Sequence, residues 1–188
     1  GQPPVATDGR SKTGLTSFTL KGKFTFGSKP DSVTLSCTVE LPAGLTVNAS
    51  LPVSVGIGNV TGSATVDPKG KVMGLTSAGS GATPITKPIT KLQFKWPRLD
   101  KKNPVTKTGD QATLAITLAG KSLDAAGFDT EGIVKSDATG KTLVTGKKGV
   151  DRNIQTAIVI GGVSYYAQAK AAYVLTKGTG QLTGRAQK

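Results

Sequence analysis

The residues of this chain that could do acid–base chemistry are a few carboxylates. Asp129 and Glu131 form the closest acidic pair, with Asp124 nearby. Hydrolysis of a glycosidic bond uses two carboxylates across a sugar, and Ca²⁺ prefers carboxylate and carbonyl oxygens. The spacing of the three acids matches no known calcium loop. We therefore expect a solvent-exposed acidic turn here and no metal site.

The chain lacks the residues that usually carry out nucleophilic catalysis or bind transition metals. The chain has no histidine and one cysteine, Cys37. A Ser-His-Asp or Cys-His arrangement is therefore impossible, and the commonest ligand of transition metals is missing. Cys37 alternates in phase with Leu35 and Val39, which predicts a buried, unreactive thiol. We expect a protein that is not an enzyme and uses no cofactor; an enzyme acting only through carboxylates, Lys or Tyr is the remaining alternative.

Positive charge is the most prominent chemical feature of the chain. Twenty-four Lys and Arg against eleven Asp and Glu give a formal net charge of +13, which predicts attraction to nucleic acid, an acidic polysaccharide or an anionic envelope. The simpler interpretation is a solvated surface, because the positive charges are spread along the chain. The densest basic stretch, whose only acid is Asp100, is our candidate polyanion patch: Lys87, Lys91, Lys95, Arg98, Lys101, Lys102 and Lys107.

Many short strands would position these side chains. The chain is rich in Gly, Thr and Ser and contains only two Glu residues, a composition that suits strands and tight turns better than helices. Apolar residues alternate with polar ones from Thr16 onward, as in half-buried strands. Gly58-Asn59 and Gly161-Gly162 predict tight hairpins. We expect an all-β fold of about ten to twelve strands and no long helix.

The pattern also predicts a simple domain organisation. Residues 1–14 lack apolar periodicity and predict an extended N-terminal arm, and residues 15–188 predict a β-sandwich domain. Residues 77–83 predict a surface loop, and Ser122 to Ala126 predict one helical turn capped by Ser122. No run of eighteen apolar residues exists, so we expect no membrane span. An extracellular or cell-surface location is expected from the composition, although no targeting signal is visible.

Three segments of the first half recur in the same order in the second half. The matched pairs are residues 23–26 with 93–96, 31–38 with 110–117, and 55–60 with 158–163. Alternating Thr, Val and Leu produce chance matches easily, so coincidence competes with an internal duplication. A duplication would divide the chain into halves of about 15–80 and 85–188, with the extra residues of the second half between Ala119 and Asn153. Each half has few strands, so we favour one intertwined body.

The chain loosely resembles a family of secreted modules. The features that carry the resemblance are the Lys21-Gly-Lys-Phe24 strand, the Leu41-Pro-Ala-Gly44 break, the Ile160-Gly-Gly-Val163 hairpin and the ending from Tyr173 to Gly180. Together they look like the immunoglobulin-like β-sandwich modules of secreted bacterial proteins, over most of the chain from Thr16 onward. None of these motifs is specific. The resemblance implies a structural role and an immunoglobulin-like β-sandwich, and it transfers no site residues.

Two functions compete on this evidence. The first is a structural protein of the cell exterior that assembles with itself, as a surface module or fibre subunit, by adding a strand to a neighbour's sheet edge. Its candidate strand-exchange segment has one apolar face: Phe18, Leu20, Phe24 and Phe26. The second is a basic binding module for an acidic polymer, using the candidate polyanion patch, with affinity that falls steeply with salt. Lysines gathered on one face would favour binding, and an even spread would favour the structural role.

Overall fold

The chain folds into one large, curled, antiparallel sheet. A computed structural model describes residues 11–12, 14–48, 50–80 and 85–184, so residues 1–10 of the predicted arm lie outside the described part. The strands are β1 (Ser11–Lys12), β2 (Leu15–Phe24), β3 (Asp31–Glu40), β4 (Leu51–Ile57), β5 (Val60–Val66), β6 (Val72–Gly79), β7 (Ile85–Thr86), β8 (Ile89–Lys95), β9 (Gln111–Gly120), β10 (Val150–Ile160), β11 (Val163–Thr176) and β12 (Thr179–Gly184). The all-β prediction is confirmed.

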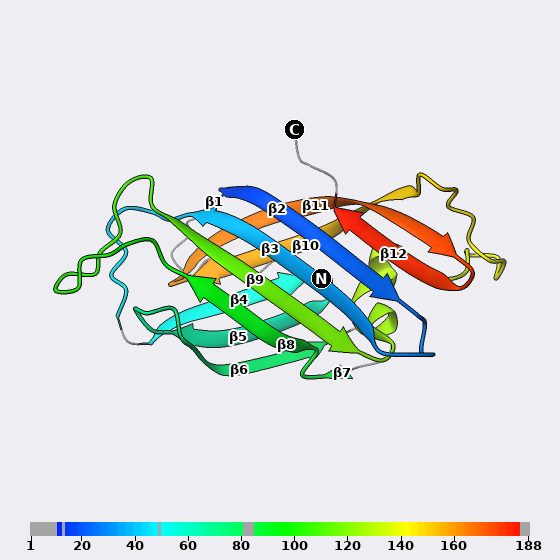
Figure 1. Ribbon diagram of the computed structural model, residues 1–188, viewed down its shortest axis with the longest axis horizontal. Coiled ribbons are helices and arrows are strands. Elements are labelled where there is room, and N and C mark those ends of the chain that lie inside the picture. Colours follow the sequence, from blue (N-terminus) through cyan, green and yellow to red (C-terminus); the bar gives the residue numbers. More distant parts are fainter. Residues whose placement is uncertain (1–10, 13, 49, 81–84, 185–188) are drawn as a thin grey trace.

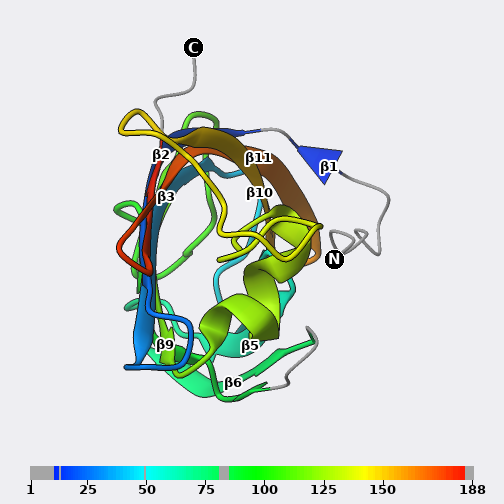
Figure 2. The same ribbon diagram turned by 90° about the vertical axis from the view of Figure 1, so that its right-hand side faces the viewer.

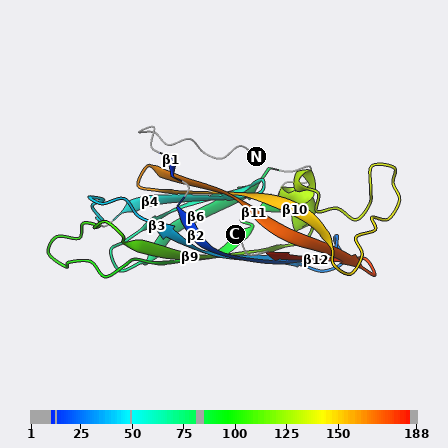
Figure 3. The same cartoon turned by 90° about the horizontal axis from the view of Figure 1, so that it is seen from above.

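The strands follow one hydrogen-bonded path. Their order is β7-β6-β5-β4-β10-β11-β12-β2-β3-β9-β8, and β1 pairs in parallel with β11. In Figure 1 the strands β2, β3, β9 and β8 run diagonally in front, with β10 and β11 crossing behind them. Figure 3 shows the two layers from above. The immunoglobulin-like sandwich stays a prediction, because this path is one continuous curled sheet.

The two ends of the path meet, so the sheet curls back on itself. The backbone N–H groups of Lys87 and Ile89 donate to Ser77 of β6, to its carbonyl at 3.2 Å and to its hydroxyl at 3.0 Å. Beside them, the Trp96 indole N–H at the end of β8 donates to the Asp67 carbonyl in the β5–β6 turn at 2.9 Å. The free edge of β8 is therefore covered by β6 and by this turn.

Alternation along each strand sends the apolar side chains into the core. In β3, Val33, Leu35, Cys37 and Val39 are buried while the residues between them face outward. Full burial of one such aliphatic side chain contributes about 1.5–3 kcal/mol. Burial also raises the pKa of the Cys37 thiol to about 12, so the prediction of a buried, unreactive cysteine is confirmed. Trp96 is also buried and packs against Phe94.

A short helical segment fills one end of the curled sheet. It contains a π-helix, η1 (Asp124–Phe128), and a 3-10 turn, η2 (Asp129–Glu131), and Figure 2 shows it enclosed by the strands. The ring of Phe128 meets that of Phe24 edge-on, with centroids 5.7 Å apart. The predicted Ser122 cap is wrong: Leu123 occupies the N-cap position and makes no side-chain capping bond. None of the helices in the described ranges is long and apolar enough to cross a membrane.

The strand β6 occupies part of a segment predicted as a loop. The prediction for residues 77–83 is wrong at 77–79, which belong to β6, and residues 81–84 lie outside the described part. The physical reason is the η1 segment packed beside the strand. A Cβ atom at Gly79 would lie 2.8 Å from the carbonyl oxygen of Ala126, so a small residue is required where η1 crosses this strand.

Two of the three pairs of matched segments lie side by side, whereas residues 23–26 and 93–96 lie at the ends of β2 and β8, which β3 and β9 separate. β3 pairs with β9, and these strands are flanked by β2 and β8; β4 pairs with β10, and these are flanked by β5 and β11. Ser36 pairs with its own match Ala115, and Val55 pairs with its own match Ile158. Each of these pairings is antiparallel, so an approximate local two-fold axis passes through each pair. The axis at Ser36 and Ala115 relates Gln93 to Thr19 and not to its sequence match Lys23. The duplication stays a prediction, and this order of strands favours it.

Candidate binding face on the outer side of the sheet

Five neighbouring strands present a polar outer surface, which we call the threonine–lysine face. It is the outward side of β12, β2, β3, β9 and β8. The same alternation that buries the apolar residues directs Ser, Thr and Lys outward, as the strictly alternating first six residues of β3 show. The face therefore follows directly from the period-two pattern of each strand.

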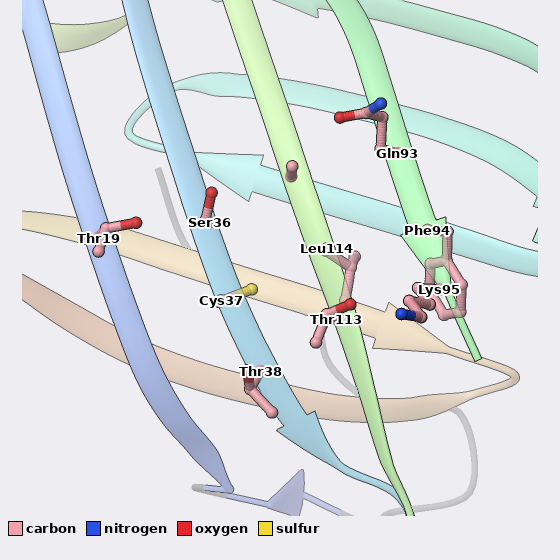
Figure 4. A pocket seen from close by; sticks show the side chains of 10 residues that line it. Thr19, Ser36, Cys37, Thr38, Gln93, Phe94, Lys95, Thr113 and Leu114 are labelled. Atoms are coloured by element: carbon pink, nitrogen blue, oxygen red, sulfur yellow. The ribbon is translucent and has the colours of Figure 1, made fainter. Parts of the chain in front are cut away.

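Strand register arranges the outward side chains in rows. One row crosses the face as Lys91, Thr117, Thr34, Lys21 and Thr183, each paired with the next across neighbouring strands. The next two rows are Gln93–Ala115–Ser36–Thr19 and Lys95–Thr113–Thr38. Figure 4 shows these two rows side by side on the four strands.

Two shallow hollows lie along this face. The larger, of about 560 Å³, is lined by residues of β2, β3, β9 and β8 that include Ser36, Thr113 and Lys95. The smaller, of about 250 Å³, lies over β12, β2 and β3 and includes Lys21 and Thr34. Both are open to solvent, so the surface suits an extended ligand better than an enclosed small molecule.

The polar groups of the face are available to a ligand. Lys21, Lys23, Lys91 and Lys95 are exposed and form no ion pair with any other residue that the structure describes. The only outward-facing acid on the described strands of this face is Glu40, at the end of β3 beside Gln111. Hydroxyls of this face that make no hydrogen bond with another described residue include those of Thr19, Ser32, Thr34, Ser36, Thr113, Thr117 and Thr183.

The structure divides the candidate polyanion patch among three places. Lys91 and Lys95 lie on the threonine–lysine face, and Lys87 lies in the turn before β8. The remaining members are exposed on the loop that joins β8 to β9: Arg98, Lys101, Lys102 and Lys107. Sequence reasoning did not include Lys21 and Lys23 in the patch. Their signal was the phase of alternation in residues 15–24, opposite to the apolar positions.

The candidate strand-exchange segment forms a central strand. Leu20 and Phe24 are buried, whereas Phe18 and Phe26 are partly buried against the core. β2 pairs with β3 along most of its length and with β12 from Lys21 to Phe24. Exchange of this strand between molecules would therefore require these pairings to open first. Strand exchange stays a prediction.

The acidic residues of the η1–η2 segment are partly withdrawn from solvent. Burial, followed by repulsion from Asp31, raises the pKa of Asp124, and burial raises that of Glu131. Glu131 accepts a hydrogen bond from the backbone N–H of Gln155 at 2.9 Å. The expectation of a fully solvated acidic turn is therefore wrong. In the described ranges, no three His, Cys, Asp or Glu residues are grouped so that they could hold a metal ion.

Asp31 ties this segment to the β2–β3 turn. Its buried carboxylate accepts the backbone N–H groups of Thr25 at 2.7 Å and Leu123 at 3.0 Å. Hydrogen bonds to an ionised acceptor are stronger than those between neutral groups. Asp31 and its neighbours therefore stabilise the fold, and the chemistry available to a ligand lies on the threonine–lysine face.

Comparison with known proteins gives no match: no protein-family model, no curated protein and no solved structure is significantly similar to this chain.

Proposed function

We propose that this protein is a non-catalytic binding module for an acidic polysaccharide, which lies on the threonine–lysine face. The single observation that carries the proposal is the gathering, on one open sheet surface, of four lysines without an ion pair and a set of hydroxyls without a hydrogen bond among the described residues. Lysines attract the acid groups of the polymer, and hydroxyls hydrogen-bond to its sugar hydroxyls and acid oxygens.

The dimensions of the face suit a polymer. The strands β3 and β9 are each ten residues long, or about 33 Å at the usual rise per residue. The five strands span about 19 Å at the usual spacing between strands. A polymer lying across such a surface contacts several lysines at once, and the binding free energies add along the chain.

Sugar acids fit this face better than nucleic acid does. Proteins that bind single-stranded nucleic acid stack bases on exposed aromatic side chains. The outward positions of the threonine–lysine face, within the described strands, are Thr, Ser, Lys, Gln, Ala and Glu, with no aromatic residue. Phe94 and Trp96, which alternate with its lysines, point into the core. An extracellular or cell-surface location would place the protein where such polysaccharides occur.

The test is salt-dependent binding to polygalacturonate, measured with the intact protein and a quadruple variant, Lys21→Gln/Lys23→Gln/Lys91→Gln/Lys95→Gln. At about 0.5–1 kcal/mol for each exposed ion pair, we expect the variant to bind on the order of 100-fold more weakly. The matched control is Lys135→Gln/Lys141→Gln/Lys147→Gln/Lys148→Gln, whose lysines are exposed on the β9–β10 connection.

The control removes the same charge from another part of the molecule. We expect it to bind within a few fold of the unchanged protein. Equal losses in the two variants would show that net charge alone attracts the polymer, and no binding at low salt by any variant would overturn the proposal. Circular dichroism would establish that each variant retains the β-sheet signal of the unchanged protein.

A further inference from the structure

The threonine–lysine face contains the same pair of residues twice. Lys21 of β2 lies opposite Thr34 of β3, and Lys95 of β8 lies opposite Thr113 of β9. Thr34 and Thr113 are matched residues of the two halves of the sequence. Each pair lines its own hollow, Lys21 and Thr34 the smaller one and Lys95 and Thr113 the larger one.

An approximate two-fold axis relates the two pairs. It passes between Ser36 and Ala115, which pair with each other at the middle of the face. Thr34 lies two residues before Ser36, and Thr113 lies two residues before Ala115. Because β3 and β9 are antiparallel, these two steps run in opposite directions from the axis and bring the pairs to diagonally opposite positions.

We propose that the face is made of two equivalent half-sites, one at Lys21–Thr34 and one at Lys95–Thr113, each binding one acidic group of the same polysaccharide chain. This inference depends on the proposed function. The two lysines are separated by three strand spacings across the sheet and four residues along it, which places their Cα atoms about 20 Å apart on a regular sheet. A long chain bridges both half-sites, and a short one occupies them independently.

Lys91 has no counterpart under this symmetry. It lies opposite Thr117, and the matched threonine, Thr38, lies opposite Ser17. Lys91 therefore adds positive charge to the face without belonging to either half-site pair. Its replacement should weaken binding while leaving the number of half-sites unchanged.

The experiment follows the backbone amide signals of Thr34 and Thr113 by NMR during titration with a galacturonic acid trimer at low salt. In the unchanged protein we expect both signals to shift, with dissociation constants within about two-fold of each other. Lys21→Gln should weaken the response at Thr34 by about two- to five-fold and spare Thr113, and Lys95→Gln should do the reverse. Each variant should weaken binding of long polygalacturonate by a similar factor.

The controls separate this inference from the proposed function. Lys91→Gln should weaken the response at both threonines and remove neither, and the amide spectrum reports whether each variant is folded. A shift of only one of the two amide signals with the trimer, or loss of both shifts in Lys21→Gln, would overturn the inference of two half-sites. Neither result would contradict the binding of polysaccharide to the face. Absence of binding by both the trimer and the long polymer would overturn the proposed function itself.

Discussion

The molecule has two hydroxyl-lined outer surfaces that differ in charge. The neutral face is the outward side of β4, β5 and β6, and it carries Ser54, Thr61, Ser63 and Thr76 around a hollow of about 380 Å³. No charged residue occurs in these three strands. The threonine–lysine face has a similar density of hydroxyls and four lysines in addition.

The hydroxyls of the two faces also differ in what they bind. On the neutral face, the hydroxyls of Ser63 and Thr76 hydrogen-bond to each other at 3.1 Å, whereas those of Ser54 and Thr61 make no hydrogen bond with another described residue. On the threonine–lysine face, hydroxyls such as those of Thr34 and Thr113 make no such bonds within the chain. Hydroxyls engaged within the protein stabilise the sheet, and those left unbonded are available to a ligand. The lysines therefore distinguish the two faces more clearly than the hydroxyls do, and they favour the threonine–lysine face as the proposed binding surface.

Charge reversal gives the largest expected contrast between the faces. Lys21→Glu/Lys95→Glu replaces two attractions with two repulsions, so we expect polygalacturonate binding to fall by more than about 100-fold. Lys147→Glu/Lys148→Glu changes the net charge equally at a distant loop, and at physiological salt its effect is screened beyond about 8 Å. Binding curves at fixed ionic strength give both values. Similar losses in the two double variants would show that the face has no special role.

Removal of hydroxyls should give a smaller contrast. Thr34→Val/Thr113→Val retains side chains that favour strands and removes two hydrogen-bonding groups worth about 0.5–1.5 kcal/mol each. We expect roughly ten-fold weaker binding of polygalacturonate, measured by calorimetry, with unchanged stability. On the neutral face, Ser63→Ala/Thr76→Val should leave binding unchanged and lower the free energy of unfolding by about 1 kcal/mol. Unchanged binding by Thr34→Val/Thr113→Val together with weaker binding by Ser63→Ala/Thr76→Val would contradict the proposal that the polymer lies on the threonine–lysine face.

Local pattern was sufficient to predict much of the fold. Alternation identified β2, β3, β9 and the hairpins at Gly58 and Gly161, because a half-buried strand requires period two along its own length. It did not identify β6 past Thr76, where small residues accommodate η1. It predicted one helical turn at Ser122 to Ala126 but not that this turn is a π-helix over Asp124–Phe128, because five residues carry too little periodicity to define the type of helix.

The composition of the threonine–lysine face depends on strand register, which the local pattern does not determine. The candidate polyanion patch was a run along the chain, and only Lys91 and Lys95 of that run lie on the face. Lys21 joins them because β2 pairs with β3 and β3 with β9, a pairing of strands about eighty residues apart in sequence. The matched segments could have indicated this neighbourhood, since equivalent strands of two similar halves commonly pack beside each other.

The smallest expected effect on binding comes from a change that should alter stability alone. One oxygen of Asp124 is buried and makes no hydrogen bond within the described structure, and burial together with repulsion from Asp31 raises its pKa. The folded protein therefore holds this proton at pH values where the unfolded chain has released it. The contribution of Asp124 to the free energy of unfolding is most favourable below the pKa of this group in the unfolded chain, about 3.9. It is lost as the pH rises through the pKa of the group in the folded protein.

Asp124→Asn removes this ionisation from the end of the molecule filled by η1 and leaves both outer faces untouched. We expect a higher Tm than that of the unchanged protein at pH 7 and a smaller dependence of Tm on pH between 4 and 7; part of the slope should persist, because the raised pKa of Glu131 acts in the same direction. Binding of polygalacturonate at pH 7 should not change. A lower Tm at pH 7 would mean that the carboxylate stabilises the segment. Altered binding would mean that the threonine–lysine face responds to the packing of η1, because Asp31 connects Leu123 to the β2–β3 turn.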